Sequence, residues 1–382
     1  MAEPTEILDA AFQHANANLE QSLVADQQIR ESANYVARNL KNRAGTRLLV
    51  ACLLAKLHRP DVDVRKPYTE IGDADAFSGR TYDERYVTAF INEHNVPCNS
   101  TTAFLTPALR NRNSTLTKDI NLVGKPPQLY QSVLSLLDDV HSGKVPANIL
   151  LTEIVRLLLI DRNERQRRIE TLVATLDTTK DAIPLSSEDI INLIEKHMSL
   201  KGTSRLSVLA VAAAYQSAEE FLGERVLALQ PHNAADIQTG ALGDVEITLI
   251  ADDEVITSYE MKNKRVTCED IDRALKKLSL SNKRINNYIF ITTESIESDL
   301  QDYLRSLYHK TGGIEFVILD CISFIRHFLH LFHRLRTQFL EAYQVLILSE
   351  PQSAVSYSVK EAFLAMRQAA ETGMEDEVTY TD

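Results

Sequence analysis

The second half of the chain alternates between two hydrophobic periods, and this alternation constrains the fold more than any other feature. Helical spacing and short β-branched or aromatic runs follow one another from Lys201 to about residue 320. The predicted helices cover 204–229, 268–280 and 294–310, and the predicted strands cover 243–250, 254–262, 286–292 and 314–320. Such an order predicts an α/β (α+β) fold, with a mixed β-sheet core flanked by helices.

The first half is mainly helical by the same criterion. Residues 46–58, "TRLLVACLLAKLH", are apolar nearly all round, as in a buried helix. Residues 186–200 open with Ser-x-x-Asp, a helix-capping signal. The pattern changes at Lys201-Gly202, so we expect two domains, 1–200 and 201–382.

Composition and the lack of targeting segments limit the class of protein. The 382 residues are 44% hydrophobic and 25% charged, which predicts a soluble protein with well-formed cores. The start lacks a signal-peptide pattern, and no run reaches the ~18 apolar residues of a membrane span. We therefore expect a cytoplasmic protein without membrane contact. The cysteines lie far apart, which indicates reduced thiols.

The charge distribution indicates that contact with an anionic partner would be confined to part of the surface. A net charge of −12 argues against a surface that coats nucleic acid, but it permits a basic groove. Basic residues gather in two clusters, for which a solvated charged face is the alternative interpretation. They are Arg110, Arg112, Lys118 and Lys125 in the first, and Lys262, Lys264, Arg265, Lys276, Lys277, Lys283 and Arg284 in the second.

The segment 243–271, "GDVEITLIADDEVITSYEMKNKRVTCEDI", carries the candidate chemistry. Glu260 and Lys262 are two apart on a predicted strand and so share a face. Asp244 joins them if the preceding strand pairs through the short turn at 251–254. Two converging carboxylates suit Mg²⁺, and a neighbouring ammonium can assist an attacking water or stabilise phosphate charge. The alternative is three ordinary charges on a solvated hairpin.

These residues resemble the PD-(D/E)XK nuclease core over about residues 204–320. Asp244 is followed after fifteen residues by Glu260-Met261-Lys262, with Gly243 where the motif has proline. More narrowly, the chain is similar to type II restriction endonucleases of the SacI group. The segments that carry this similarity are "HNAADIQTGALGDVEI", "YEMKNKRVTCEDI", "DVRKPYTEIG", "FSGRTYDERYV" and "TTAFLTPALRN".

The resemblance implies roles for individual residues. Asp244 and Glu260 would bind Mg²⁺, Met261 would lend its backbone carbonyl, and Lys262 would be the catalytic lysine. An acid from the preceding helix often joins such a metal site, although a solvated helix face is an equal alternative. The candidates are Glu219, which fits best, Glu220 and Glu224. Glu246, on the face of Asp244, is a further possible ligand.

Sequence reading would require side chains that distinguish base edges. Arginine pairs bidentately with guanine, and asparagine with adenine. Both types occur in the irregular, basic segment around residue 110, where phosphate contact or plain surface is the alternative role. The DNA-binding candidates are Arg80, Arg85, Arg110, Asn111, Arg112 and Asn113 in the first half, and Lys264 and Arg265 beside the carboxylates.

The resemblance implies a Mg²⁺-dependent type II restriction endonuclease that cuts double-stranded DNA at a short palindrome, one containing the AGCT core if it follows the SacI group. Cutting a palindrome implies a homodimer, and restriction implies a cognate DNA methyltransferase as genetic partner. Residues 1–200 would supply recognition and dimer contacts, and 201–382 would cut. The alternatives are a repair, transposition or modification-dependent nuclease, or a DNA-binding protein on this fold without catalysis.

Overall fold

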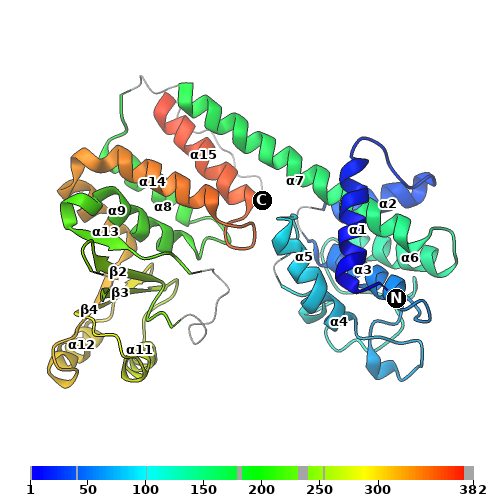
Figure 1. Cartoon of the computed structure of the whole chain (residues 1–382), viewed down its shortest axis with the longest axis horizontal. Coiled ribbons are helices and arrows are strands. Elements are labelled where there is room, and N and C mark those ends of the chain that lie inside the picture. The colour runs from blue at the N-terminus through cyan, green and yellow to red at the C-terminus, as the bar shows by residue number, and fades with distance from the viewer. Residues whose placement is uncertain are drawn as a thin grey trace. The chain divides into compact units, whose positions relative to one another are not determined.

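A computed structural model of the chain describes residues 2–39, 42–99, 101–178, 183–230, 240–252 and 254–373. The chain forms two compact units, which are described separately (Figure 1). Unit 1 comprises Met1–Arg168 with Pro351–Ser353, and unit 2 comprises Ile169–Glu350 with Ala354–Asp382. The boundary lies within the long helix α7 (Ala147–Thr178), whereas the sequence pattern placed a division at 200/201.

Unit 1 is helical, as predicted for the N-terminal region. Helix α3 (Ala44–His58) is buried from Ala44 to Ala55, which fits its all-round apolar sequence. The other elements pack around this helix in one hydrophobic core. They are α1 (Pro4–Ala17), α2 (Gln27–Ala37), η1 (Thr69–Ile71), α4 (Gly79–Tyr82), η2 (Asp83–Val87), α5 (Thr88–Glu93), η3 (Ala103–Leu105), α6 (Pro127–His141) and the first part of α7.

A fully buried ion pair joins three segments of unit 1. Arg47 of α3 and Asp83 of η2 lie 2.7 Å apart, and neither side chain is exposed. The second carboxylate oxygen of Asp83 accepts hydrogen bonds from Thr102 Oγ1 and Ala103 N, each at 2.7 Å. Because removal of one partner would leave a buried charge, at a cost of about 3–5 kcal/mol, the pair fixes η3 against η2 and α3.

Unit 2 contains the predicted mixed sheet, with strand order β1-β2-β3-β4-β5. The first three strands pair antiparallel, and β3, β4 and β5 pair parallel. The strands are β1 (Glu224–Val226), β2 (Val245–Leu249), β3 (Val255–Lys262), β4 (Asn287–Thr292) and β5 (Glu315–Asp320). The fold class expected from the alternating periods is therefore confirmed.

Helices cover both faces of this sheet, as Figure 1 shows for α9 and α13 on one side and α11 and α12 on the other. Val245, Ile247 and Tyr259 pack into the core on the α9 side, and Tyr288 and Phe290 into the core on the α11 side. Within the described residues, the helices of unit 2 are the last part of α7, α8 (Ser187–Met198), α9 (Leu206–Leu222), α11 (Cys268–Leu280), α12 (Ser298–Lys310), α13 (Cys321–Leu331), η4 (His333–Leu335), α14 (Arg336–Ser349) and α15 (Tyr357–Thr372). None of the described helices is both long and apolar enough to cross a membrane.

One predicted boundary is wrong. The helix expected over 204–229 ends at Leu222, and the edge strand β1 follows it. Gly223 has a φ of +69°, in the left-handed region that closes helices, and its backbone N–H bonds to Glu219 O. Gly223 therefore stops the helix, and Val226 after it belongs to the sheet.

Candidate active site

The hairpin of β2 and β3 brings the two predicted carboxylates together. Val245 pairs with Tyr259 in antiparallel register, and Asp244 N donates to Tyr259 O at 2.7 Å. Asp244 therefore lies beside Glu260, on the face that the sequence pattern predicted. The Asp244 carboxylate also accepts a hydrogen bond of 2.7 Å from Met261 N. The residue that follows Glu260 thus holds the Asp244 side chain in place.

Gly243 allows this close approach of the two strands. A Cβ atom at this position would lie 2.4 Å from Tyr259 O and 2.6 Å from Ser258 Oγ. Such distances are shorter than any tolerated contact, so only glycine fits between the strands. The departure from proline in the motif therefore has a steric reason in this chain.

Glu260 is surrounded by cationic and hydroxyl groups. Its Oε1 lies 2.8 Å from Lys262 Nζ, and its Oε2 lies 3.1 Å from Lys277 Nζ and 2.8 Å from the Tyr288 hydroxyl. The side chain is only 15% exposed. Burial raises the pKa of Glu260, but Lys277, Lys262 and Tyr288 outweigh burial and hold this pKa below its usual value. Glu260 is therefore a partly buried carboxylate that stays ionised.

A third carboxylate lies within reach of Lys262. Asp270 Oδ1 is 3.6 Å from Lys262 Nζ and 3.7 Å from Lys264 Nζ, and its side chain has no exposed surface. Burial raises the pKa of Asp270, whereas hydrogen bonds from Thr267 and the charges of both lysines lower it to below its ordinary value. Lys262 thus has two anionic neighbours, Glu260 and Asp270.

Glu246 shares the face of Asp244 but serves another purpose. Both of its carboxylate oxygens accept from Lys283 Nζ, at 2.7 and 3.0 Å. Its Oε1 also accepts from Leu242 N at 3.0 Å. Glu246 therefore ties down the segment that leads into Gly243 and Asp244.

The helix acids predicted to join the site do not reach it. Helix α9 packs against the sheet face opposite to Asp244 and Glu260. Its last turn, which carries Glu219, also lies at the other end of β2, because Ile250 N bonds to Gly223 O. Glu220 belongs to the same turn, and Glu224 pairs with Leu249 at that end. The structure thus places Glu219 away from Asp244 and Glu260, because α9 covers the other face of the sheet and ends at the other end of β2.

The donor set around Asp244 and Glu260 fits a hard cation held by few protein ligands. Among the described residues, no group of three or more His, Cys, Asp or Glu side chains is placed to hold a metal. Two carboxylates nevertheless suffice for Mg²⁺, which keeps several waters and takes further oxygens from substrate phosphate. Each oxygen of Glu260 faces an ammonium group, Oε1 that of Lys262 and Oε2 that of Lys277.

Four of the DNA-binding candidates line one pocket in unit 1. The pocket holds about 390 Å³ and is lined by Arg80, Arg110, Asn111 and Asn113, with Phe104 among its apolar walls. Within the described part of the chain the Arg110 guanidinium has no hydrogen-bond partner. Asn111 and Asn113 have φ values of +53° and +46°, a conformation that asparagine tolerates better than most residues. Segments about 30 residues apart in sequence thus meet at one concave surface.

The other DNA-binding candidates are placed differently. Arg112 donates to Asn121 O at 2.7 Å, and Arg85 lies over the Tyr86 ring, 5.3 Å from its centroid. In unit 2, Lys264 lies near Asp270, and Arg265 pairs with Glu297 at 2.7 Å. Arg112 and Arg265 are thus already engaged within the protein.

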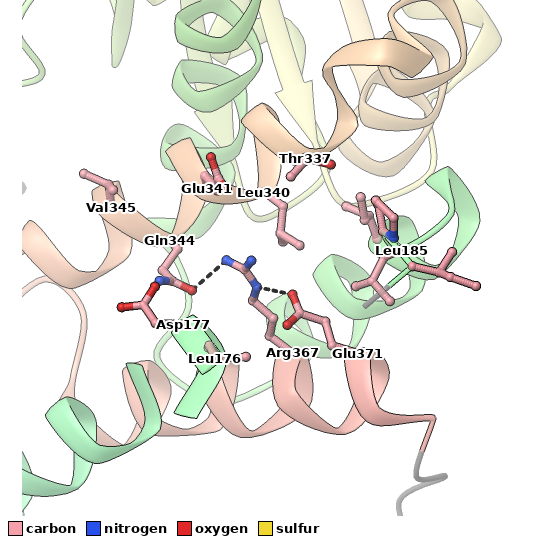
Figure 2. Close-up of a pocket in the computed structure, with 13 residues that line it drawn as sticks. Leu176, Asp177, Leu185, Thr337, Leu340, Glu341, Gln344, Val345, Arg367 and Glu371 are labelled. Atoms are coloured by element: carbon pink, nitrogen blue, oxygen red, sulfur yellow. Dashed lines mark hydrogen bonds and ion pairs between the residues drawn. The ribbon is translucent and has the colours of Figure 1, made fainter. Parts of the chain in front are cut away.

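A second pocket, of about 410 Å³, lies in unit 2 among the ends of α7, α14 and α15. Figure 2 shows Arg367 of α15 directed at Gln344 of α14 and at Glu371, with bonds of 2.8 and 2.7 Å. None of the predicted site residues lines this pocket. Its helices pack on the α9 side of the sheet, so the pocket is separate from the carboxylates.

Sequence reasoning missed Asp270 and Tyr288 as neighbours of the site. Tyr288 reaches Glu260 only through the parallel pairing of β3 with β4, which no local pattern reveals. Asp270 had a local signal, since Thr267-x-x-Asp270 is a capping box at the start of α11. This signal predicts the helix start but not the burial of the carboxylate beside two lysines.

Comparison with known families supports a restriction endonuclease, and hence a hydrolase of the nuclease class. The family concerned is described as the SacI restriction endonuclease C-terminal domain, whose model matches residues 183–294. The match includes the β2–β3 hairpin and α11, with Asp244, Glu260 and Lys262. It confirms the resemblance to the SacI group that the sequence indicated. No curated protein matches the chain.

Proposed function

We propose that the protein is a type II restriction endonuclease that uses Mg²⁺ to hydrolyse phosphodiester bonds in double-stranded DNA at a short palindrome. The observation that carries this proposal is the hydrogen bond from Met261 N to Asp244, which anchors that carboxylate on the strand of Glu260, whose own carboxylate pairs with Lys262. Asp244 and Glu260 would hold Mg²⁺, with the Met261 carbonyl as a further ligand. When bound there, the ion supplies Lewis-acid chemistry at the scissile phosphate.

The residues of the chain have separable tasks in this proposal. Lys262 places an ammonium beside the carboxylate pair, where it orients the attacking water and offsets the charge that develops on the phosphate. Lys277 and Tyr288 fix the side chain of Glu260. The Arg80–Asn113 pocket of unit 1 supplies groups that distinguish base edges, with Arg85 and Arg112 nearby in sequence and Lys264 and Arg265 as phosphate contacts.

Two further partners follow from this function. Cutting both strands of a palindrome requires two active sites related by a two-fold axis, so the active species is a homodimer. A cognate DNA methyltransferase is expected as the genetic partner, because the host's own sites require protection.

The test is to incubate the purified protein with phage DNA and MgCl₂ and to map the ends produced. We expect discrete fragments that end at one sequence, and Lys262→Ala should abolish them. Lys196→Ala, which removes an exposed lysine of α8, should leave the fragments unchanged. Smeared or structure-specific products would favour a repair or transposition nuclease. Absence of Mg²⁺-dependent cleavage by the wild type would favour a DNA-binding protein without catalysis.

A further inference from the structure

The carboxylate of Asp270 performs two tasks with its two oxygens. Oδ2 accepts from Thr267 N at 3.1 Å and from Thr267 Oγ1 at 2.9 Å, which completes the cap of α11. Oδ1 faces three cations, with Arg273 Nη2 at 2.5 Å, Lys262 Nζ at 3.6 Å and Lys264 Nζ at 3.7 Å. Only the first task is needed to begin the helix.

A second capping box in the same unit shows what capping alone requires. At the start of α8, Asp189 Oδ2 accepts from Ser186 N at 3.2 Å and from Ser186 Oγ at 2.6 Å. The Asp189 side chain is exposed, and within the described residues it forms no ion pair. Burial of a charged carboxylate is costly unless cations compensate it, so the burial of Asp270 needs a reason beyond the cap.

We propose that Asp270 is a positioning residue that holds the Lys262 ammonium beside the carboxylate pair; this inference rests on the proposed function. Lys262 Nζ is within reach of two carboxylates, Glu260 at 2.8 Å and Asp270 at 3.6 Å. If Glu260 Oε1 ligates a cation, that oxygen is shared between the cation and the ammonium, so its hold on Lys262 weakens. Asp270, buried and anchored by Thr267, is then the fixed anion that keeps Lys262 in place.

The charges around Asp270 support this assignment. The single Asp270 carboxylate pairs with Lys262, Lys264 and Arg273, so these four side chains together carry a net positive charge. Such an excess attracts a phosphodiester to the site, while the shared carboxylate limits how far each lysine can swing. A rigid anion with several cations thus orients Lys262 without neutralising the group.

Two substitutions of Asp270 separate the charge from the cap. Glutamate and glutamine both complete a capping box at this position, but only glutamate keeps the negative charge. We expect Asp270→Gln to lower the single-turnover cleavage rate by about 100-fold, as misplacement of a reacting group by about 1 Å does. Asp270→Glu should recover most of this rate. DNA affinity without metal, measured by fluorescence anisotropy, should change less than threefold in both variants.

Asp189→Gln is the matched control, because it changes the same capping position in α8 and touches no predicted site residue. It should leave the cleavage rate within twofold of wild type. It should lower the melting temperature less than Asp270→Gln does, because Asp189 is exposed and forms no ion pair among the described residues. The proposal is overturned if Asp270→Gln cuts within threefold of the wild-type rate. It is also overturned if Asp270→Glu is as slow as Asp270→Gln, or if Asp189→Gln is equally slow.

A measurement without DNA distinguishes failure of this inference from failure of the proposed function. The ¹³Cε resonance of Lys262, assigned with Lys262→Met, should shift in Asp270→Gln and remain unchanged in Asp189→Gln. If it shifts while the wild type cuts no DNA, the contact stands and the proposed function fails. If the wild type cuts DNA and the resonance does not move, the nuclease stands and the role of Asp270 is refuted.

Discussion

Replacing Gly243 by alanine tests whether the close approach of β2 and β3 holds Asp244 in position. The added Cβ would lie 2.4 Å from Tyr259 O, where a tolerable contact begins at about 3.0 Å. The segment before β2 would therefore have to move by about 0.6 Å. This movement acts on Asp244 directly, because Asp244 N bonds to the same carbonyl oxygen at 2.7 Å.

The size of the effect follows from that displacement. Overpacking against a backbone carbonyl costs about 1–3 kcal/mol of stability. Misplacement of a catalytic group by about 1 Å costs about 100-fold in rate, so a shift of about 0.6 Å should cost about tenfold. Proline, which would restore the family motif, brings a Cβ to the same place and should be at least as harmful.

The assay compares single-turnover cleavage and urea unfolding for the wild type, Gly243→Ala and Gly143→Ala. Gly143 follows α6 in unit 1 with a φ of +76°, and a Cβ atom there would meet open space, so alanine costs about 1 kcal/mol through backbone strain alone. We expect the cleavage rate to fall, by about tenfold, only in Gly243→Ala. If Gly243→Ala cleaves at the wild-type rate, the position of Asp244 does not depend on the close approach of β2 and β3.

Three further outcomes are expected. Burial lowers the pKa of His197 from 6.5 to about 4, so the stability it contributes above pH 6.5 is lost as the pH falls through 4. The free energy of unfolding, measured with urea, should fall by about 3 kcal/mol over this pH range. His197→Gln should not show this fall, whereas the control His309→Gln should show it. Lys277→Met should destabilise the metal-free protein by about 1–3 kcal/mol, because it leaves the partly buried Glu260 with fewer counter-charges. Mg²⁺ should restore part of the lost melting temperature. An unchanged melting temperature in the variant would refute the pairing of Lys277 with Glu260. Arg110→Ala should weaken discrimination between cognate and single-mismatch DNA by about 1–3 kcal/mol in competition binding, and Lys144→Ala should not; equal loss in both would exclude base reading by Arg110.

Local patterns predicted the sheet and the pairing of the two carboxylates well. The strands of Asp244 and Glu260 are joined by a short connection, so period-two alternation determines which side chains share a face. The same patterns placed α11, β4 and β5 within one residue of their observed starts. These are features that residues close in sequence specify among themselves.

The features that could not be predicted depend on contacts between distant segments. Glu219 is a helix acid of the expected type, yet α9 lies across the opposite face of the sheet. Tyr288 meets Glu260 only because β4 lies parallel to β3. Arg80 and Arg110 meet in one pocket, and Asp83 ties η2 to η3 through hydrogen bonds from Thr102 and Ala103. Periodicity carries no information on which faces and which strands will meet.

Because both carboxylates lie on one hairpin, they are synthesised before other residues that contact Glu260. Asp244 and Glu260 are 16 residues apart, so the entropy lost on closing the loop between them is small. Lys277 and Tyr288 arrive later, after the crossover through α11. Until then Glu260 lacks the ammonium and the hydroxyl that contact its Oε2, and we expect a nascent chain halted before residue 288 to leave DNA uncut.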